Sequence, residues 1–103
     1  MRIVKRPVFL LDVEECADHL FTESGEIVAG RWKDALERTI SLISKFPEIG
    51  QIRSDLPVPG IRTFYLKGFP RYLIFYRLQH ATIELLRVRH GMMHLPGLFE
   101  TKS

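Results

Sequence analysis

The sequence predicts an α+β domain with an N-terminal strand, followed by an antiparallel hairpin of two helices. The hairpin packs on one face of an antiparallel sheet, which a three-stranded C-terminal meander completes. Three observations predict this: a short alternating segment opens the chain, two apolar stripes with helical spacing follow, and three strand-like runs with short turns come last. With 103 residues, 46% of them hydrophobic, the chain can build one core. We expect one domain over residues 1–97 and a C-terminal tail over residues 98–103.

The N-terminal strand and the first helix are expected to meet at a proline. Residues 2–6 alternate weakly and indicate a short strand, and Pro7 suits the first turn of a helix because its missing N–H would be unpaired there. We expect this helix to run from about residue 7 to residue 22, with Asp12 among its surface residues. Its apolar stripe consists of Phe9, Val13, Cys16 and Leu20.

A second helix should follow at once. Ser24 is a credible N-cap, and Pro47 ends the helical pattern. The two stripes would face each other in an antiparallel hairpin. The second stripe consists of Val28, Trp32, Ala35, Thr39, Leu42 and Phe46.

The C-terminal half should contain a crossing loop and a meander. Residues 47–60 hold three prolines and two glycines without a sustained period, which indicates a loop. Runs of β-branched and aromatic residues then alternate with short turns. The expected strands are 62–66, 72–77 and 82–90, and the expected turns are 67–70 and 78–81.

Cations gather on these strands. Between Arg62 and Arg89 there are six lysines or arginines and one acid, Glu84, although the whole chain carries a net charge of only +3. An open sheet face lined with guanidinium groups and tyrosines could bind an anionic partner such as a nucleic acid. The same charges could simply keep an exposed strand soluble and unpaired. The candidate groove residues are Arg62, Lys67, Arg71, Tyr72, Arg77, Arg87, Arg89 and His90.

Alternation conflicts with burial in the last expected strand. Arg87 and Arg89 share one face with Ile83 and Leu85, so a regular strand cannot present an unbroken apolar face. We therefore expect a bulge near residues 85–86, which would direct Arg87 toward the open groove and leave His90 at the strand end.

The sequence contains no obvious pair of groups for acid–base catalysis. His90 could transfer a proton near neutral pH, or could simply bond a nearby carbonyl. His90 and His94 lack companions for a zinc site, so we expect neither a metal nor another cofactor. Cys16 is the single cysteine, which favours a reducing, cytoplasmic setting, and no apolar run is long enough to span a membrane.

With these elements and motifs the chain resembles the RelE/ParE superfamily of bacterial type II toxin–antitoxin toxins, and the ParE-like branch most. The resemblance extends from Ile3 to about Leu95. It is most specific in residues 68–77, GFPRYLIFYR, and 83–91, IELLRVRHG, and FPEIG at residues 46–50 fits as well.

The resemblance implies a growth-arresting, plasmid-stabilising type of toxin that a cognate antitoxin neutralises and that meets operator DNA only through this antitoxin. The ParE-like branch is associated with poisoning DNA gyrase and lacks a full nuclease set. The RelE-like branch cleaves mRNA on the ribosome, and a nuclease of that kind would use Arg62, Arg87 and His90 here. A third interpretation is a non-toxic module that binds the antitoxin for autoregulation. Met93 stands where ParE-like chains often have an arginine, which puts the role of that arginine in doubt.

Overall fold

The computed structural model describes residues 1–91 and residue 99. The expected domain boundary at residue 97 and the positions Met93 and His94 lie outside the described residues. The elements are β1 (Arg2–Lys5), α1 (Pro7–Ser24), α2 (Glu26–Lys45), β2 (Gln51–Ile52), β3 (Ile61–Leu66), β4 (Phe69–Gln79) and β5 (Thr82–His90).

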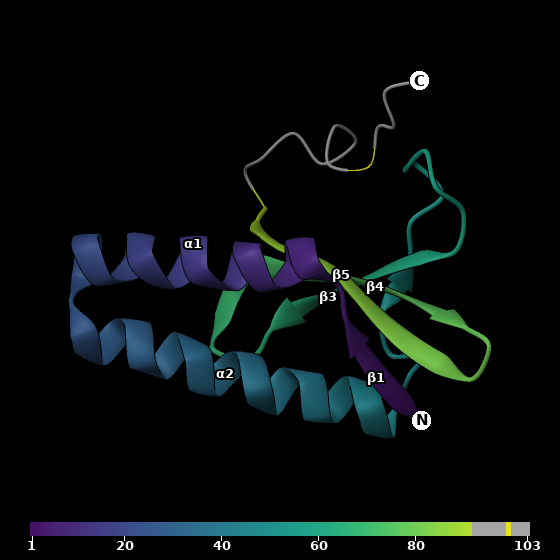
Figure 1. Cartoon of the computed structure of the whole chain (residues 1–103), viewed down its shortest axis with the longest axis horizontal. Helices are drawn as coiled ribbons and strands as arrows, with labels where there is room; N and C mark the ends of the chain where they lie inside the picture. Colours follow the sequence, from purple (N-terminus) through teal and green to yellow (C-terminus); the bar gives the residue numbers. More distant parts are fainter. Residues whose placement is uncertain (92–98, 100–103) are drawn as a thin grey trace.

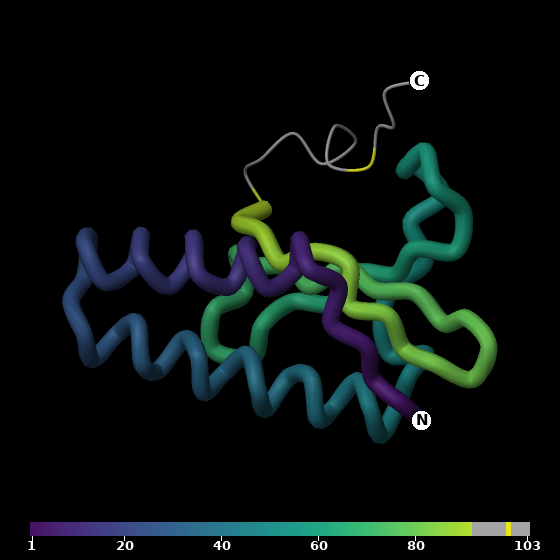
Figure 2. Tube along the Cα trace, in the orientation of Figure 1, coloured from purple at the N-terminus to yellow at the C-terminus, as the bar shows by residue number. Residues whose placement is uncertain are grey.

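The architecture is a helix hairpin packed on one side of a five-stranded sheet with the order β1-β5-β4-β3-β2 (Figure 1). The predicted α+β fold class is confirmed. Strands β2 to β5 pair antiparallel, whereas β1 joins β5 in parallel, so the complete sheet is mixed. Figure 2 shows the N-terminal segment running beside the last strand, so the two ends of the domain share one sheet edge.

The helix hairpin turns on a glycine. Ser24 was expected to cap the second helix, but this expectation is wrong: Ser24 is the last residue of α1, and Gly25 stands between the helices. Gly25 has φ of 89°, a region that residues with a Cβ enter at a cost, and its N–H donates to the carbonyl of Phe21. The local signal of a serine is overridden because this turn needs a positive φ.

The meander contains the predicted bulge. Arg87 lies opposite Phe75 and Leu85 lies opposite Tyr76, which leaves Leu86 as the extra residue of β5. The bulge lets Leu85 and Val88 both point into the core, where each is fully buried. The conflict between alternation and burial is thus resolved within the strand.

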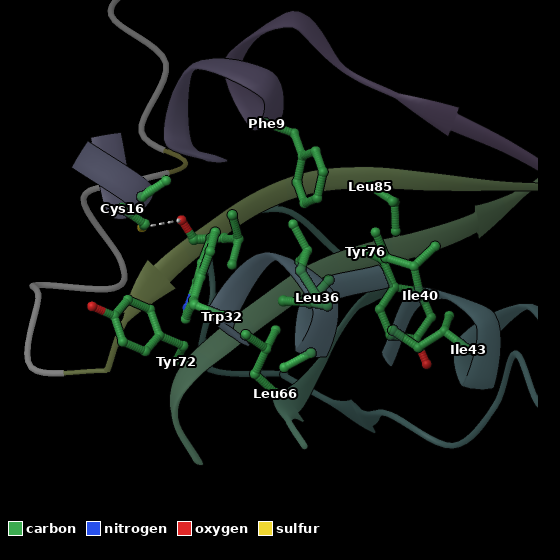
Figure 3. Close-up of a cluster of buried hydrophobic side chains, with 14 of the residues drawn as sticks. Phe9, Cys16, Trp32, Leu36, Ile40, Ile43, Leu66, Tyr72, Tyr76 and Leu85 are labelled. Atoms are coloured by element: carbon green, nitrogen blue, oxygen red, sulfur yellow. Dashed lines mark hydrogen bonds between the residues drawn. The ribbon is translucent and has the colours of Figure 1, made fainter. Parts of the chain in front are cut away.

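The main core lies between the helices and the sheet. Trp32 and Ile43 of α2 are fully buried with Tyr76 of β4 (Figure 3). Ile74 of β4 is fully buried in the same cluster. Phe9 adds a ring from α1. Because both helices and the three central strands contribute, the hairpin and the sheet form one cooperative unit. Within the described residues, no helix is long and apolar enough to cross a membrane.

A second, smaller core covers part of the opposite sheet face, which was expected to be partly open. Leu56, from the segment between β2 and β3, packs with Ile61 and Phe75, and all three are buried. The ring of Phe99 lies 5.4 Å from that of Phe75. The two-residue strand β2 also lies in the segment that was expected to be a loop throughout. This cover leaves less of the face for a groove.

Candidate functional site

A buried carboxylate at the junction of α1 and β5 pairs with two arginines of β5. Asp12 is 1% exposed. It accepts hydrogen bonds from Arg87 Nε at 2.6 Å and Arg87 Nη2 at 3.0 Å, and from Arg89 Nη1 at 3.1 Å. The backbone N–H of Val88 donates to the same carboxylate at 3.2 Å. A buried charge of this kind is tolerated because it is paired and fully hydrogen-bonded.

The topology explains why an acid is needed there. Strand β1 pairs with β5 only as far as Leu85, so the rest of β5 forms an edge beside α1. Asp12 lies on the same face of α1 as Phe9 and Cys16, three and four residues away, and takes the place of a strand partner for Val88. The carboxylate thereby fastens the first helix to the last strand.

The sequence reasoning placed two of these residues incorrectly. Asp12 was expected at the surface and is buried. Arg87 was expected to point into an open groove, but its side chain is only 17% exposed and pairs with Asp12. The signal for Asp12 is present in the sequence, because an acid within an apolar helical stripe implies a buried partner, and the partner proves to be 75 residues away.

The same junction raises the pKa values of Arg89 and Cys16. Burial disfavours the charged form of Arg89, but hydrogen bonds to Glu15 and Asp12 outweigh it, and its pKa is raised. The thiol of Cys16 donates to the carbonyl of Val88 at 3.8 Å (Figure 3). Burial raises the pKa of Cys16 from 9.0 to about 11, so this thiol is a poor nucleophile at neutral pH.

Three more of the predicted cations lie away from this junction. Arg62 donates from Nη1 to the carbonyls of Glu48 and Gly50, which ties β3 to the end of α2. Arg77 Nε donates to Glu84 at 3.1 Å. Lys67 Nζ donates to the hydroxyl of Tyr65 and lies 5.0 Å from the centre of that ring. The structure therefore does not gather the six cations on one face.

The residues that do come together lie at the end of β5. Tyr72 and His90 are directly paired across β4 and β5, and their rings meet edge to face at 5.2 Å. Arg71, which precedes Tyr72 in β4, is exposed. Burial raises the pKa of Tyr72. A cavity of about 310 Å³ lies here, lined by Glu15, Cys16, His19, Tyr72, Arg89 and His90.

This arrangement does not assemble the groups of a phosphodiester-cleaving site. Such a site needs a base, an acid and cations aimed at one phosphate. The guanidinium groups of Arg62 and Arg87, which a nuclease would need, are engaged by carbonyls and by Asp12. Among residues 1–91 and 99, no group of three or more His, Cys, Asp or Glu side chains could hold a metal. Whether the predicted groove residues bind a target or an antitoxin stays a prediction.

A large apolar pocket lies at the other end of the helix hairpin. It has a volume of about 920 Å³ and opens between the end of α2 and the strands beside it. Phe46, on its wall, is 59% exposed. An exposed apolar hollow in so small a domain is typical of a protein-binding surface. Its lining residues are Met1, Leu42, Lys45, Phe46, Pro47, Glu48, Ile49, Lys67 and Leu78.

Comparisons with known proteins agree with the fold and with the resemblance. The profile of the family described as "ParE toxin of type II toxin-antitoxin system, parDE" matches residues 3–95. Toxin ParE3 of Caulobacter vibrioides is 30% identical over 102 residues, which cover 99% of this chain and 98% of that protein. A solved structure described as "Chromosomal ParDE TA system from P. aeruginosa" has a TM-score of 0.74 at 20% identity, covering 87% of this chain and 95% of that one. The structural likeness concerns the fold alone.

Proposed function

The chain belongs to the ParE toxin family of type II toxin–antitoxin systems, and from this premise we propose that it acts in the cytoplasm as a poison of DNA gyrase. A cognate antitoxin neutralises it, and operator DNA is contacted only through that antitoxin. The toxin works by binding its target rather than by cleaving a bond.

One observation supports binding over nuclease chemistry. Arg87 is the residue that a nuclease would direct at the phosphate, and Asp12 holds it through two hydrogen bonds while being 1% exposed itself. Releasing it would leave a buried carboxylate without this partner, which is costly. The arginine therefore stabilises the fold and is not available for a substrate.

The test is a supercoiling assay with purified gyrase and the purified full chain. We expect inhibition that the antitoxin reverses. Arg71→Glu, which changes the exposed cation beside the Tyr72–His90 pair, should weaken inhibition, whereas Arg38→Glu on the exposed face of α2 should not. Full supercoiling activity at saturating toxin would refute the gyrase proposal.

Two further assays separate the alternatives. Primer extension on translated mRNA should reveal no new cleavage sites after induction, and cuts that disappear in an Arg87→Gln variant would favour the ribosome-dependent nuclease. Induction without the antitoxin should arrest growth. Normal growth at full expression of folded protein would favour the non-toxic module.

We propose that the antitoxin covers the apolar pocket. Phe46 on the pocket wall and Phe21 near the hairpin tip are similarly exposed, at 59% and 57%, and so provide a matched pair. Phe46→Asp should abolish co-purification with the cognate antitoxin, and Phe21→Asp should leave it unchanged. Equal binding by both variants would show that the antitoxin docks elsewhere.

A further inference from the structure

A polar pocket on the sheet face away from the helices carries an unbalanced positive charge. It has a volume of about 370 Å³ and lies beside the turn that joins β4 to β5. Figure 1 shows this turn projecting beyond the ends of the helices. The pocket is separate from both the Asp12 junction and the apolar pocket. Its lining residues are Val4, Arg6, Arg77, Gln79, His80, Thr82 and Glu84.

Strand pairing fixes the floor of this pocket. Glu84 lies directly opposite Val4 on one side and Arg77 on the other, so the three side chains share one face. The neighbouring residues Ile3 and Ile83 point to the opposite face and join the main core. Arg6 follows the end of β1 and completes one wall.

Two guanidinium groups share a single carboxylate here. Arg77 Nε lies 3.1 Å and Arg6 Nη1 lies 3.5 Å from the oxygens of Glu84, whose side chain is 12% exposed. The lining arginines Arg6 and Arg77 thus contribute two positive charges against the one negative charge of Glu84, which leaves one excess positive charge.

Within residues 1–91 and 99, most N–H donors of these two groups have no hydrogen-bond partner in the protein. A guanidinium carries five N–H donors. In the described part of the chain, neither side chain makes a hydrogen bond or an ion pair other than the one with Glu84. Both arginines line the pocket, together with the polar residues Thr82 and Gln79. Glu84 holds the two groups side by side without saturating either of them.

The turn beside the pocket adopts a costly conformation. His80 and Ala81 have φ of 51° and 58°, in the left-handed region where glycine or asparagine is usual. The Thr82 hydroxyl donates to the His80 carbonyl at 3.3 Å, which helps to fix the turn. His80, at this turn, is one of the residues that line the pocket.

We propose that this pocket binds a phosphodiester group of a nucleic-acid strand. Paired guanidinium groups offer parallel donors that fit the oxygens of a phosphate. The single excess charge matches the single negative charge of a phosphodiester better than the double charge of a phosphomonoester. The pocket is also larger than a phosphate group, so an adjoining sugar has room beside the Gln79 amide and the Glu84 carboxylate. This site does not depend on the identity of the toxin's target.

The test is fluorescence anisotropy with a short labelled single-stranded oligonucleotide and the purified full chain. Arg77→Gln should weaken binding about tenfold, and it should reduce the dependence of log K on log salt by about 0.7, the value for one phosphate contact on a single strand. Arg38→Gln removes an equal charge from the helix side of the molecule and should change affinity less than about twofold. Equal effects of the two variants would overturn the proposal, because they would indicate attraction by net charge alone.

A second variant and a second readout guard against misfolding. Glu84→Gln removes the competing carboxylate and should tighten binding more than Glu14→Gln, which makes the same charge change at an exposed position of α1. Equal gains would indicate attraction by net charge alone. Amide chemical-shift changes on adding the oligonucleotide should centre on Gln79, Thr82 and Glu84 in the unmodified protein. Shifts confined to other elements would refute the site. Displacement of the oligonucleotide by an acidic peptide at equal concentration would refute the ligand class, whereas inorganic phosphate should displace it only weakly.

Discussion

Replacing Asp12 by asparagine tests whether the α1–β5 junction depends on a charge. Asparagine keeps the size of the side chain and one carbonyl oxygen, so it can still accept from the backbone N–H of Val88. It cannot offer a negative charge to Arg87 and Arg89, which both donate to the carboxylate in the native protein. The substitution therefore isolates the ionic part of the contact.

The structure sets the expected size of the effect. Removing one partner from a buried ion pair costs about 3–5 kcal/mol. Here both arginine side chains are 17% exposed, and Arg89 keeps its 2.6 Å contact with Glu15. We therefore expect the lower end, about 3 kcal/mol in the free energy of unfolding. For a domain of this size, such a loss lowers the melting temperature by roughly 15 °C.

The assay is thermal unfolding followed by circular dichroism. Asp18→Asn is the control, since it makes the same change at an exposed position of the same helix. Adding Arg87→Met to Asp12→Asn should recover part of the loss, because the double variant no longer contains an arginine deprived of its carboxylate. If Asp12→Asn and Asp18→Asn have the same melting temperature, the charge of Asp12 does not stabilise the contact between α1 and β5 as we infer.

Three further perturbations probe other parts of the fold. Tyr76→Phe removes a buried hydroxyl that donates to a backbone carbonyl and accepts from the Gly50 N–H. Urea unfolding should show that the free energy of unfolding falls by about 1–3 kcal/mol. Tyr65→Phe, at an exposed position, should change it little. Gly50→Ala would place a Cβ 2.6 Å from the Tyr76 hydroxyl oxygen and should lower the urea midpoint; an unchanged midpoint would mean that the tyrosine can move aside. Cys16, with its pKa raised from 9.0 to about 11, should react with a thiol reagent at neutral pH about a hundredfold more slowly than an unperturbed cysteine. Because the folded state binds this thiol proton more tightly than the unfolded state, the thiol contributes its full share to the free energy of unfolding below pH 9.0. That contribution is lost as the pH rises through about 11. A Cys16→Ala protein whose stability declines equally at alkaline pH would contradict this.

Much of the fold was predictable because its signals are local. The helical stripes, the prolines at 7 and 47 and the alternating C-terminal runs each specify an element within a few residues. Even the bulge at Leu86 could be inferred, because the apolar residues of β5 cannot share one face without it. Ser24 was placed wrongly because a hairpin turn between helices favoured a glycine at the next position.

The candidate site was less predictable because its contacts join distant segments. The sequence shows a row of cations, but it does not show which acidic residues lie beside them in the folded protein. Asp12 neutralises Arg87 from the other end of the chain, and Glu84 binds Arg6 as well as Arg77. Some cations of the strands are thus paired with acids inside the fold, and others line the polar pocket beside the β4–β5 turn. The tertiary structure is needed to tell the two groups apart.

The parallel pairing of β1 with β5 also fixes when the protein can finish folding. During synthesis β1 and α1 precede the other elements, but among the strands described β1 pairs with β5 alone. The arginines that bind Asp12 follow it by 75 and 77 residues. Closing so long a loop costs entropy that only these late contacts offset. A nascent chain that has not yet released β5 from the ribosome therefore lacks the strand that joins β1 to β4, and residues of the main core stay exposed. The sheet is therefore closed at its β1 edge only after β5 has emerged, although β1 itself is made before every other strand described.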